Sequence, residues 1–569
     1  MRLDPAPSLP RSILLLPLLL PSLACRSIDE PSPPPTPEAL VADLAPRALA
    51  MDGYGGYARP VSGADATGQD WFDRGLQLVY GFNHDAGVQC FAAAAEANPD
   101  CPMAWWGIAY GYGIDVNNPD VATAEAAAAH AASQSALALV EAASPAEGAL
   151  ILAVAERAVF PLPADRKPLD QAYAEAMGEA WRLYPSDPDV GALYAEALMN
   201  LQPWDYWTAE GESVKRADEI VSVLESVLAQ HPEHPGANHF YIHAVEASGD
   251  VQRAVASAER LERLVPGSGH LVHMPSHIYI NVGRYQDAVA SNLIAIEADQ
   301  AFFAQAGDPG FYSLYYIHNI HFLAYAAMMS GQSKLAIGAT RQMEADVPPE
   351  FLEHFPEFAD GLMPAKFHAL IRFGRWQAIL DEPTYPAFRK VSIAERLYAR
   401  TVALANLGRT TEARAELEAY RAACADVPEG WLIGTNPAST ILELADQMAE
   451  GEVLWREGKS QEAYTVLRAA VAFEDGLVYD EPPGWMNPVR HALGALLLAG
   501  GEAEEALEVY LTDLEDSPAN AWSMLGKHQA LTALGEVAKA QAMAPQLALA
   551  WQHADVIPPA SCYCGAPTE

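Results

Sequence analysis

The stretch WFDRGLQLVYGFNHDAGVQCFAAAAEANPDCPMAW, residues 71 to 105, decides the fold. It begins with Trp71 and ends with Trp105, 34 residues later. Here and downstream the sequence is rich in Ala, Leu and Glu, and its apolar residues recur three to four positions apart, as on one face of a helix. No convincing run of alternating strand residues interrupts this pattern between residues 68 and 555. The sequence therefore predicts an all-α fold.

Turn glycines recur along the same region, each followed five residues later by an alanine. The pairs are Gly283 with Ala288, Gly331 with Ala336, Gly408 with Ala413, Gly458 with Ala463, and Gly501 with Ala506. This spacing marks turns between helices. The chain is therefore expected to consist of helix-turn-helix units.

The repeat resembles a known one. Trp71, Gly75, Phe91, Ala94 and Pro99 fall where the tetratricopeptide pattern has Trp, Gly, an aromatic residue, Ala and Pro, and 34 residues is the period of that repeat. The resemblance implies a right-handed α-solenoid over residues 68 to 555. With 569 residues, 51% of them hydrophobic, one long repeat domain is expected rather than several globular ones.

The ends of the chain carry other signals. Residues 1 to 25 are predicted to be an export signal, because Arg11 precedes an apolar stretch from Ile13 to Ala24 that is too short to span a bilayer. Cys25 fits a lipidation site of a bacterial lipoprotein, which would tether the protein to the cell envelope or periplasmic membrane; ordinary cleavage stays open. Residues 26 to 67 are a proline-rich linker and extension, and residues 556 to 569 a tail.

The net charge and the cysteines limit the kinds of partner and bond expected for this chain. The net charge of −40 would repel a phosphate backbone, so nucleic acid and anionic lipid are poor partners. Cys90 and Cys101 could approach each other across one turn. Cys562 and Cys564 suit a disulfide or a disordered end better than a metal site.

Two histidine pairs repeat with the repeat period. His239 and His243 lie 34 residues before His273 and His277, and residues four apart share one face of a helix. Each pair is therefore expected to present two imidazoles in one direction from neighbouring helices. We expect these four histidines to bind a transition metal jointly.

The positions of further histidines strengthen this prediction. Seven of the chain's 16 histidines lie between residues 239 and 321. In the tetratricopeptide resemblance, positions 2, 5, 9 and 12 of the first helix face the concave groove. Counted in that register, these positions hold His239, His243, Glu246, His270, His273, His277, His318 and His321. The alternative is that they are polar groove residues that bind a peptide carboxylate, or packing histidines.

Two other residues are candidates for the same site. Glu196, on the preceding unit, is expected to face the groove, where it or Glu246 would act as a ligand or proton acceptor; a packing role is the alternative. His491 again takes position 5, several units downstream. Whether it reaches the cluster depends on superhelical curvature.

The chain also resembles a group of bacterial tetratricopeptide proteins with histidine-rich helices. The shared segments are Phe82-Asn83-His84, Asn238-His239 with His243, His273-Met274-Pro275-Ser276-His277, and Asp480-Glu481-Pro482-Pro483. The match runs from Trp71 to Leu534 and implies architecture, with no activity to carry over. Asn83 and His84 are expected to cap a turn. The prolines at 482, 483 and 488 suit either a helix start or a functional loop.

An imidazole-rich ligand set predicts copper, zinc or non-haem iron, and it argues against calcium and magnesium, which prefer oxygen. Copper is favoured, because it binds such sites most tightly in the divalent series and an exported protein meets it outside cytosolic control; zinc comes next. Seven histidines could fill two three-imidazole centres. This suggests a metal-dependent oxidoreductase, or less readily a hydrolase. The alternatives are a scaffold that binds a peptide or small molecule in its groove, and a metal storage or delivery protein.

Overall fold

The computed structural model describes residues 33–565 except 55, 209–210 and 308–309, and this part of the chain is almost entirely helical. Its strands are β1 (Leu432–Ile433) and β2 (Asn436–Pro437), which pair antiparallel. The predicted all-α fold is confirmed. The finer arrangement as a tetratricopeptide solenoid stays a prediction. The predicted signal, with Cys25, lies outside the described residues.

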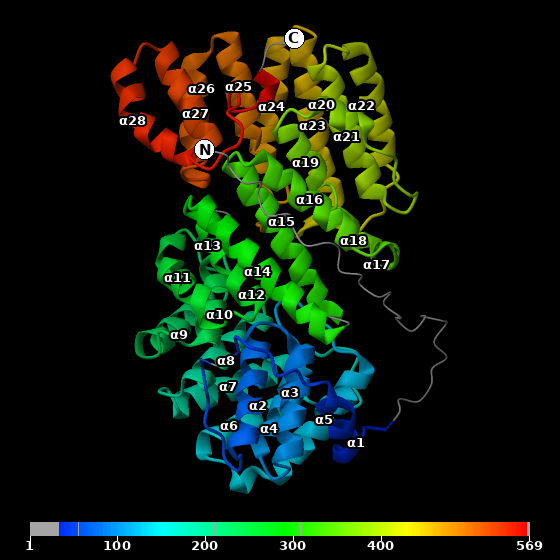
Figure 1. Ribbon diagram of the computed structural model, residues 1–569, viewed down its shortest axis with the longest axis vertical. Coiled ribbons are helices and arrows are strands. Elements are labelled where there is room, and N and C mark those ends of the chain that lie inside the picture. The colour runs from blue at the N-terminus through cyan, green and yellow to red at the C-terminus, as the bar shows by residue number, and fades with distance from the viewer. Residues whose placement is uncertain (1–32, 55, 209–210, 308–309, 566–569) are drawn as a thin grey trace, which may run out of the picture. The chain divides into compact units, whose positions relative to one another are not determined.

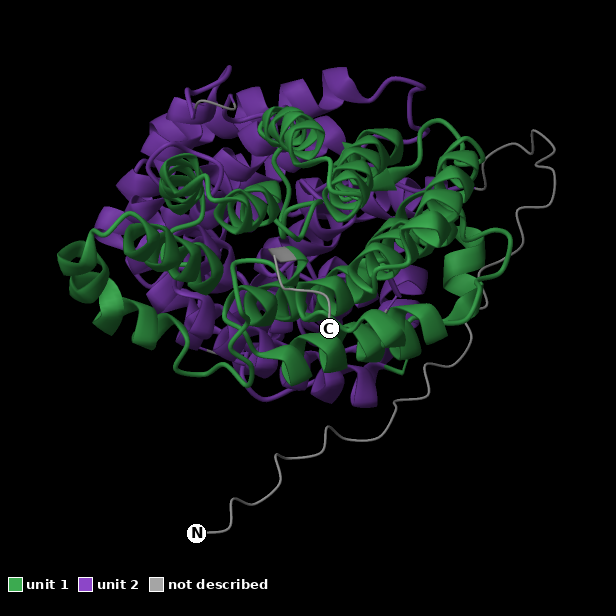
Figure 2. Cartoon of the chain, turned by 90° about the horizontal axis from the view of Figure 1, so that it is seen from above, with its two compact units in different colours: residues 1–20, 307–309, 320–569 green, residues 21–306, 310–319 purple. Residues whose placement is uncertain are grey.

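The contacts within the chain define two compact units (Figure 2). The N-terminal unit ends at Asn319, and the C-terminal unit takes Gly307 and the described residues from Ile320 onward. The boundary falls inside α15 (Ser313–Met329). The predicted extent of a single repeat domain, residues 68 to 555, stays a prediction.

Consecutive helices of the N-terminal unit pack against each other along the chain (Figure 1). They are α1 (Pro37–Leu44), η1 (Ala45–Arg47), α2 (Ala66–Tyr80), α3 (His84–Ala97), α4 (Pro102–Gly111), α5 (Thr123–Ala138), η2 (Val140–Ala142), α6 (Pro145–Arg157), α7 (Lys167–Leu183), α8 (Pro188–Asn200), α9 (Ala217–Gln230), α10 (Pro235–Val245), η3 (Val251–Ala254), α11 (Val255–Leu264), α12 (Gly269–His273), α13 (Pro275–Asn281), α14 (Tyr285–Ala306) and η4 (Gly310–Tyr312).

The helices of the C-terminal unit follow the end of α15. They are α16 (Ser333–Asp346), α17 (Pro349–His354), α18 (Pro356–Leu362), α19 (Ala365–Arg372), α20 (Trp376–Asp381), α21 (Lys390–Asn406), α22 (Thr410–Cys424), α23 (Ala438–Arg456), α24 (Ser460–Glu474), α25 (Val489–Gly500), α26 (Ala503–Asp516), α27 (Ala521–Ala533), α28 (Val537–Ala550) and η5 (Tyr563–Gly565).

Small residues let the first helices pack closely. A Cβ atom at Gly75 on α2 would lie 2.8 Å from the Phe91 ring on α3, and one at Gly107 on α4 would lie 2.4 Å from it. Because neither position has a side chain, the buried Phe91 ring fits between the three helices. The core therefore forms between neighbouring helices.

Several helix ends that turn into the next helix share one backbone pattern. A residue with positive φ donates its N–H to the carbonyl three residues back, and the next residue donates to the carbonyl five residues back. This conformation favours glycine, which has no Cβ to clash. Glycines in this pattern are Gly283, Gly331, Gly374, Gly408, Gly458, Gly501 and Gly535. The five predicted turn glycines are therefore confirmed as helix ends.

The helix end of α2 is the exception. Phe82, with φ of 56°, takes the place of the glycine: its N–H bonds to the Val79 carbonyl at 3.1 Å, and the N–H of Asn83 bonds to the Leu78 carbonyl at 2.9 Å. A left-handed conformation costs a non-glycine residue about 1 kcal/mol. Asn83 then caps α3, as predicted, by accepting from the Ala86 N–H.

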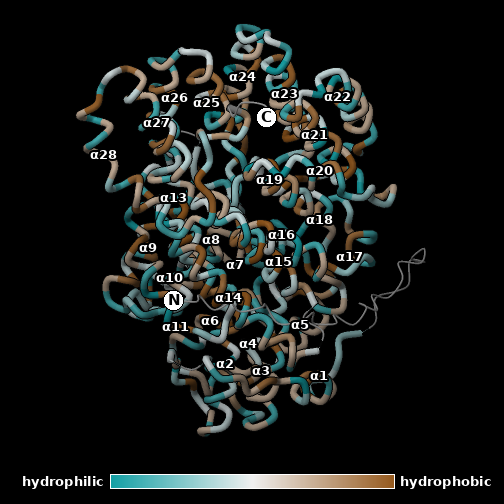
Figure 3. Tube along the Cα trace, turned by 45° about the horizontal axis from the view of Figure 1, so that its top comes forward, coloured by the Kyte–Doolittle hydropathy of each residue, from teal (hydrophilic) through white to brown (hydrophobic). Residues whose placement is uncertain are grey.

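Hydrophobic and hydrophilic residues are mixed along the helices (Figure 3). Among the described residues no helix combines the length and apolar character that crossing a membrane requires. Cys562 and Cys564 form a disulfide, whereas Cys90 and Cys101 are buried free thiols.

Candidate metal centre

Local sequence fixes the helix that carries the first histidine pair. α10 begins at Pro235, whose fixed φ suits the first helical position. The ring of His234 caps the helix, because its Nδ1 accepts from the Ala237 N–H at 3.0 Å. His239 and His243 follow one turn apart on this helix, with 0% and 2% of their surface exposed.

The second pair lies on a helix that a proline interrupts. Pro275 has no N–H to donate, so α12 ends at His273 and α13 begins at Pro275. Met274 between them keeps helical angles, φ −49° and ψ −37°. The chain therefore continues in the same direction, and the Nε2 atoms of His273 and His277 lie 2.7 Å apart.

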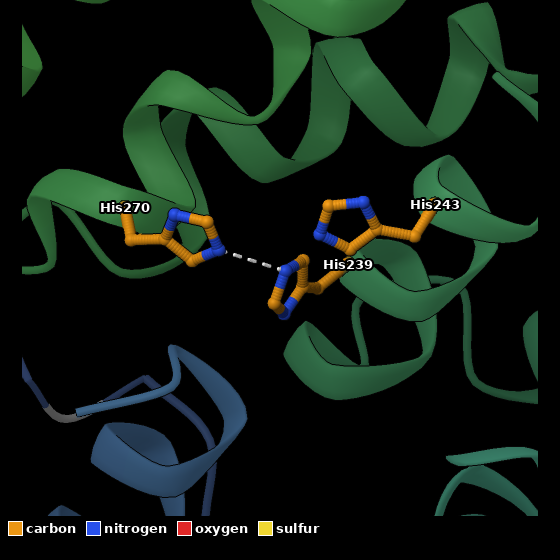
Figure 4. A group of neighbouring side chains, drawn as sticks. All are labelled: His239, His243 and His270. Carbon is orange, nitrogen blue, oxygen red and sulfur yellow. Dashed lines mark hydrogen bonds between the residues drawn. The ribbon is translucent and has the colours of Figure 1, made fainter. Parts of the chain in front are cut away.

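Three imidazoles form a first cluster, which we call His group 1: His239, His243 and His270. One ring nitrogen of each lies within 4.8 Å of the others. The Nε2 atoms of His270, on α12, and His239, on α10, are 3.1 Å apart. Figure 4 shows the rings approaching each other from the two helices. The group is buried and could hold a metal ion.

A second cluster, His group 2, consists of His273, His277 and His318. His318 lies on the part of α15 that belongs to the N-terminal unit. Its ring centroid is 4.8 Å from that of His273 and 5.6 Å from that of His277. This group also could hold a metal ion.

The two groups are neighbours. The His243 and His277 ring centroids are 5.6 Å apart, and those of His270 and His273 are 6.0 Å apart. Glu246, just after α10, accepts from Nδ1 of His243 at 3.0 Å and from Nδ1 of His277 at 2.8 Å. The Glu246 carboxylate therefore orients one ring of each histidine group through its Nδ1 atom.

Hydrogen bonds at Nδ1 determine which ring nitrogens carry protons. The Nδ1 atom of His273 faces the Asn292 oxygen at 2.7 Å, and the Asn292 amide donates to the Ala288 carbonyl, which fixes that oxygen as an acceptor. Donation by the Nδ1 atoms of His273 and His277 would leave their Nε2 atoms, which lie 2.7 Å apart, as the nitrogens that can bind a metal ion.

His group 1 has the same polarity. Nδ1 of His239 donates to the Tyr80 carbonyl at 2.6 Å, and Nδ1 of His243 donates to Glu246. Both Nε2 atoms are therefore acceptors, and that of His239 faces Nε2 of His270 at 3.1 Å. Nε2 of His243 is buried without a hydrogen-bond partner, which is costly for a polar atom that binds nothing.

Burial lowers the pKa of all six imidazoles, because it disfavours the charged form. The pKa of His243 falls to about 3, and burial together with His243 lowers that of His318 to about 4. The other four, lowered well below the usual value by burial and by neighbouring histidines, are His239, His270, His273 and His277. All six are neutral at pH 7, as metal coordination requires.

Aromatic residues that the sequence analysis did not assign to the site surround His group 1. Phe82 lies with its ring centroid 4.5 Å from His239, 5.4 Å from His270 and 6.0 Å from His243. Trp204 contacts His243 at 5.1 Å, and Tyr315 contacts His270 at 4.5 Å. The sequence feature that could have identified Phe82 is a phenylalanine at a helix end, a position where later helices have glycine.

The structure brings these predicted ligands together in three possible sets, and joint binding by the two pairs stays a prediction. Each His-x3-His pair forms a set with a third predicted histidine, His270 or His318. The third set joins the two pairs, because it consists of His243, His277 and Glu246. Because its oxygens contact the Nδ1 atoms, we assign it an orienting position behind the ligand nitrogens.

Three further predicted residues lie outside these groups. Glu196, on α8, accepts a hydrogen bond from Asn200, its other oxygen is buried without a partner, and burial raises its pKa to about 7. His321 follows His318 by one turn of α15 but belongs to the C-terminal unit. Neither Glu196 nor His321 is part of a metal-capable group of described residues.

His491 is not placed with the histidine groups. It lies on α25 of the C-terminal unit, where Nδ1 accepts from Arg372 at 2.9 Å and Nε2 donates to Asp513 at 2.9 Å. Because protein groups engage both ring nitrogens, the structure gives this histidine a role in a buried polar network. Repeat position alone could not distinguish this role from metal binding.

Comparison with known proteins does not assign the chain to a family or a function. No protein-family model matches the chain, and no curated protein matches it. The geometry of the histidine groups is therefore the basis for a function.

Proposed function

We propose that His group 1 and His group 2 each hold one transition-metal ion, so that the N-terminal unit carries a dinuclear centre. The observation that carries this proposal is the convergence of three ring nitrogens in each group, with Nε2 of His273 only 2.7 Å from Nε2 of His277. Bonds of 2.0–2.1 Å to a tetrahedral ion place two nitrogens about 3.3 Å apart. The 3.1 Å separation in His group 1 is close to that value, and the 2.7 Å separation in His group 2 requires only a small opening.

Copper is the proposed metal, with zinc the second choice. Six imidazoles without a directly bound carboxylate suit copper, and three imidazoles per ion leave a coordination position for a small ligand or substrate. An oxidoreductase is therefore favoured over a hydrolase. The burial of the rings supports metal binding over a peptide groove, since an extended peptide needs accessible side chains.

We also propose a tetratricopeptide-type scaffold of the histidine-rich group described above. The recurring helix-end glycines and the close fit of Gly75, Phe91 and Gly107 support it. Such a scaffold holds ligands from successive helices at fixed spacing.

Elemental analysis tests the metal proposal directly. Untagged protein, purified from its exported fraction and dialysed, is expected to contain two equivalents of transition metal per chain, mostly copper. Inductively coupled plasma mass spectrometry measures this content. Protein that stays metal-free after incubation with copper and with zinc would contradict the proposal.

Export is proposed from the N-terminal signal, with Cys25 as the lipidation site. The full chain is expected to fractionate with the cell envelope, and a variant lacking residues 1 to 25 is expected to stay in the cytoplasm. A Cys25→Ala variant should be exported but released from the membrane. Immunoblots of the fractions measure the distribution. Full-length protein in the cytosol would refute export.

A further inference from the structure

Phe82 occupies a position that glycine holds elsewhere in this protein. The end of α2 has the same two hydrogen bonds and the same positive φ as the seven glycine-terminated helix ends. Phenylalanine there carries backbone strain that glycine would remove. Strain of this kind persists where the side chain has a role that the surrounding structure supports.

The Phe82 side chain lies against the imidazole rings of His group 1. Its ring contacts all three imidazoles of His group 1, stacks within 17° of the His243 plane, and is 4% exposed. The Nε2 atom of His243, which has no hydrogen-bond partner, is buried in the same cluster. The ring therefore fills space that a larger ligand of this ion would need.

Trp204 also combines a positive φ with a ring contact to His group 1, and it is partly exposed to solvent. It is also a non-glycine residue with positive φ, 64°, and its ring meets that of His243 edge to face. Its indole N–H donates to the Val116 carbonyl at 3.1 Å, and 41% of the residue is exposed. Four described non-glycine residues have positive φ, and two of them contact His243. Phe82 and Trp204, which both have positive φ, therefore both contact His243.

We infer that Phe82 covers the open coordination position of the ion in His group 1 and restricts that ion to ligands of two or three atoms, such as dioxygen or azide. This inference rests on the proposed function, because it concerns the ion held there. The co-substrate class that follows is a small linear molecule. Ligands of imidazole size or larger are excluded until the ring moves.

Phe82→Gly tests this inference, because glycine suits the backbone at this helix end. Ala519→Gly is the matched control: Ala519 also has positive φ, 54°, but it is exposed in the C-terminal unit. Copper-loaded wild type and both variants are titrated with azide and with imidazole, and absorption and electron paramagnetic resonance spectra report ligand binding.

Phe82→Gly is expected to bind imidazole at least about tenfold more tightly than wild type, with azide affinity changed far less. Ala519→Gly should match wild type. Unchanged imidazole affinity at equal copper content would overturn the inference alone. Loss of copper in both Phe82→Gly and Phe82→Leu would also overturn it, by showing that the ring holds the ligands in place. A wild type that binds no copper would instead refute the proposed function.

Discussion

His273→Ala is expected to abolish metal binding at His group 2, and the double variant His239→Ala/His273→Ala is expected to lose both ions. Each substitution removes one of three imidazoles from a buried site, where no water-exposed side chain can replace it. His273 is also held by Asn292 at 2.7 Å, so its nitrogen is positioned before metal arrives. Metal content after dialysis, measured by mass spectrometry, should fall from two ions to one and then to none.

The control for this series is His553→Ala, an exposed position in the C-terminal unit. It should keep both ions. Far-ultraviolet circular dichroism should show that all variants keep their helicity. His273→Ala leaves the Asn292 oxygen without the Nδ1–H donor of His273, which lowers the stability of the folded protein by about 1–3 kcal/mol. Full metal content in the double variant would remove the basis for a histidine-bound centre.

Glu395→Met is expected to stabilise the protein at pH 7 by about 3 kcal/mol. Glu395, on α21, is 1% exposed, and neither carboxyl oxygen has a hydrogen-bond partner. Burial raises its pKa to about 8, against 4.5 for an exposed glutamate. Methionine has similar length and no polar atoms, so it fills the same space without this penalty.

The pH dependence has a definite sign. Below pH 4.5 Glu395 is protonated in both the folded and the unfolded state, so its titration does not change the free energy of unfolding. Between pH 4.5 and 8 the unfolded state releases a proton that the folded state keeps, so wild-type stability falls as pH rises. The advantage of Glu395→Met should therefore grow from pH 4.5 to pH 8.

Urea unfolding at several pH values measures this difference. Glu395→Gln removes the titration but keeps polar atoms, and should lose the same pH dependence. Glu429→Met, at an exposed loop position, is the control and should change stability little at any pH. A Glu395→Met variant equal in stability to wild type at pH 8 would show that the pKa of Glu395 is not raised in the folded protein.

Sequence patterns predicted the elements of the site because those elements depend on helix geometry. Residues four apart share a helix face, so His239 with His243 and His273 with His277 were expected to point together. Their 34-residue offset predicted neighbouring helices. The turn glycines were predictable for a similar reason, since positive φ at a helix end selects a residue without a Cβ.

Tertiary structure alone decided how the imidazoles combine. His270 and His318 complete separate groups because of how α12 and α15 are oriented against α10 and α13, and no spacing in the sequence encodes that orientation. The same limit applies to His491, whose nitrogens are engaged by Arg372 and Asp513 in the C-terminal unit. The sequence by itself determined an all-helical chain with paired histidines at helical spacing. Packing determined their burial, the partners of four of their Nδ1 atoms and the Phe82 ring beside them, because these properties depend on which atoms from distant segments meet.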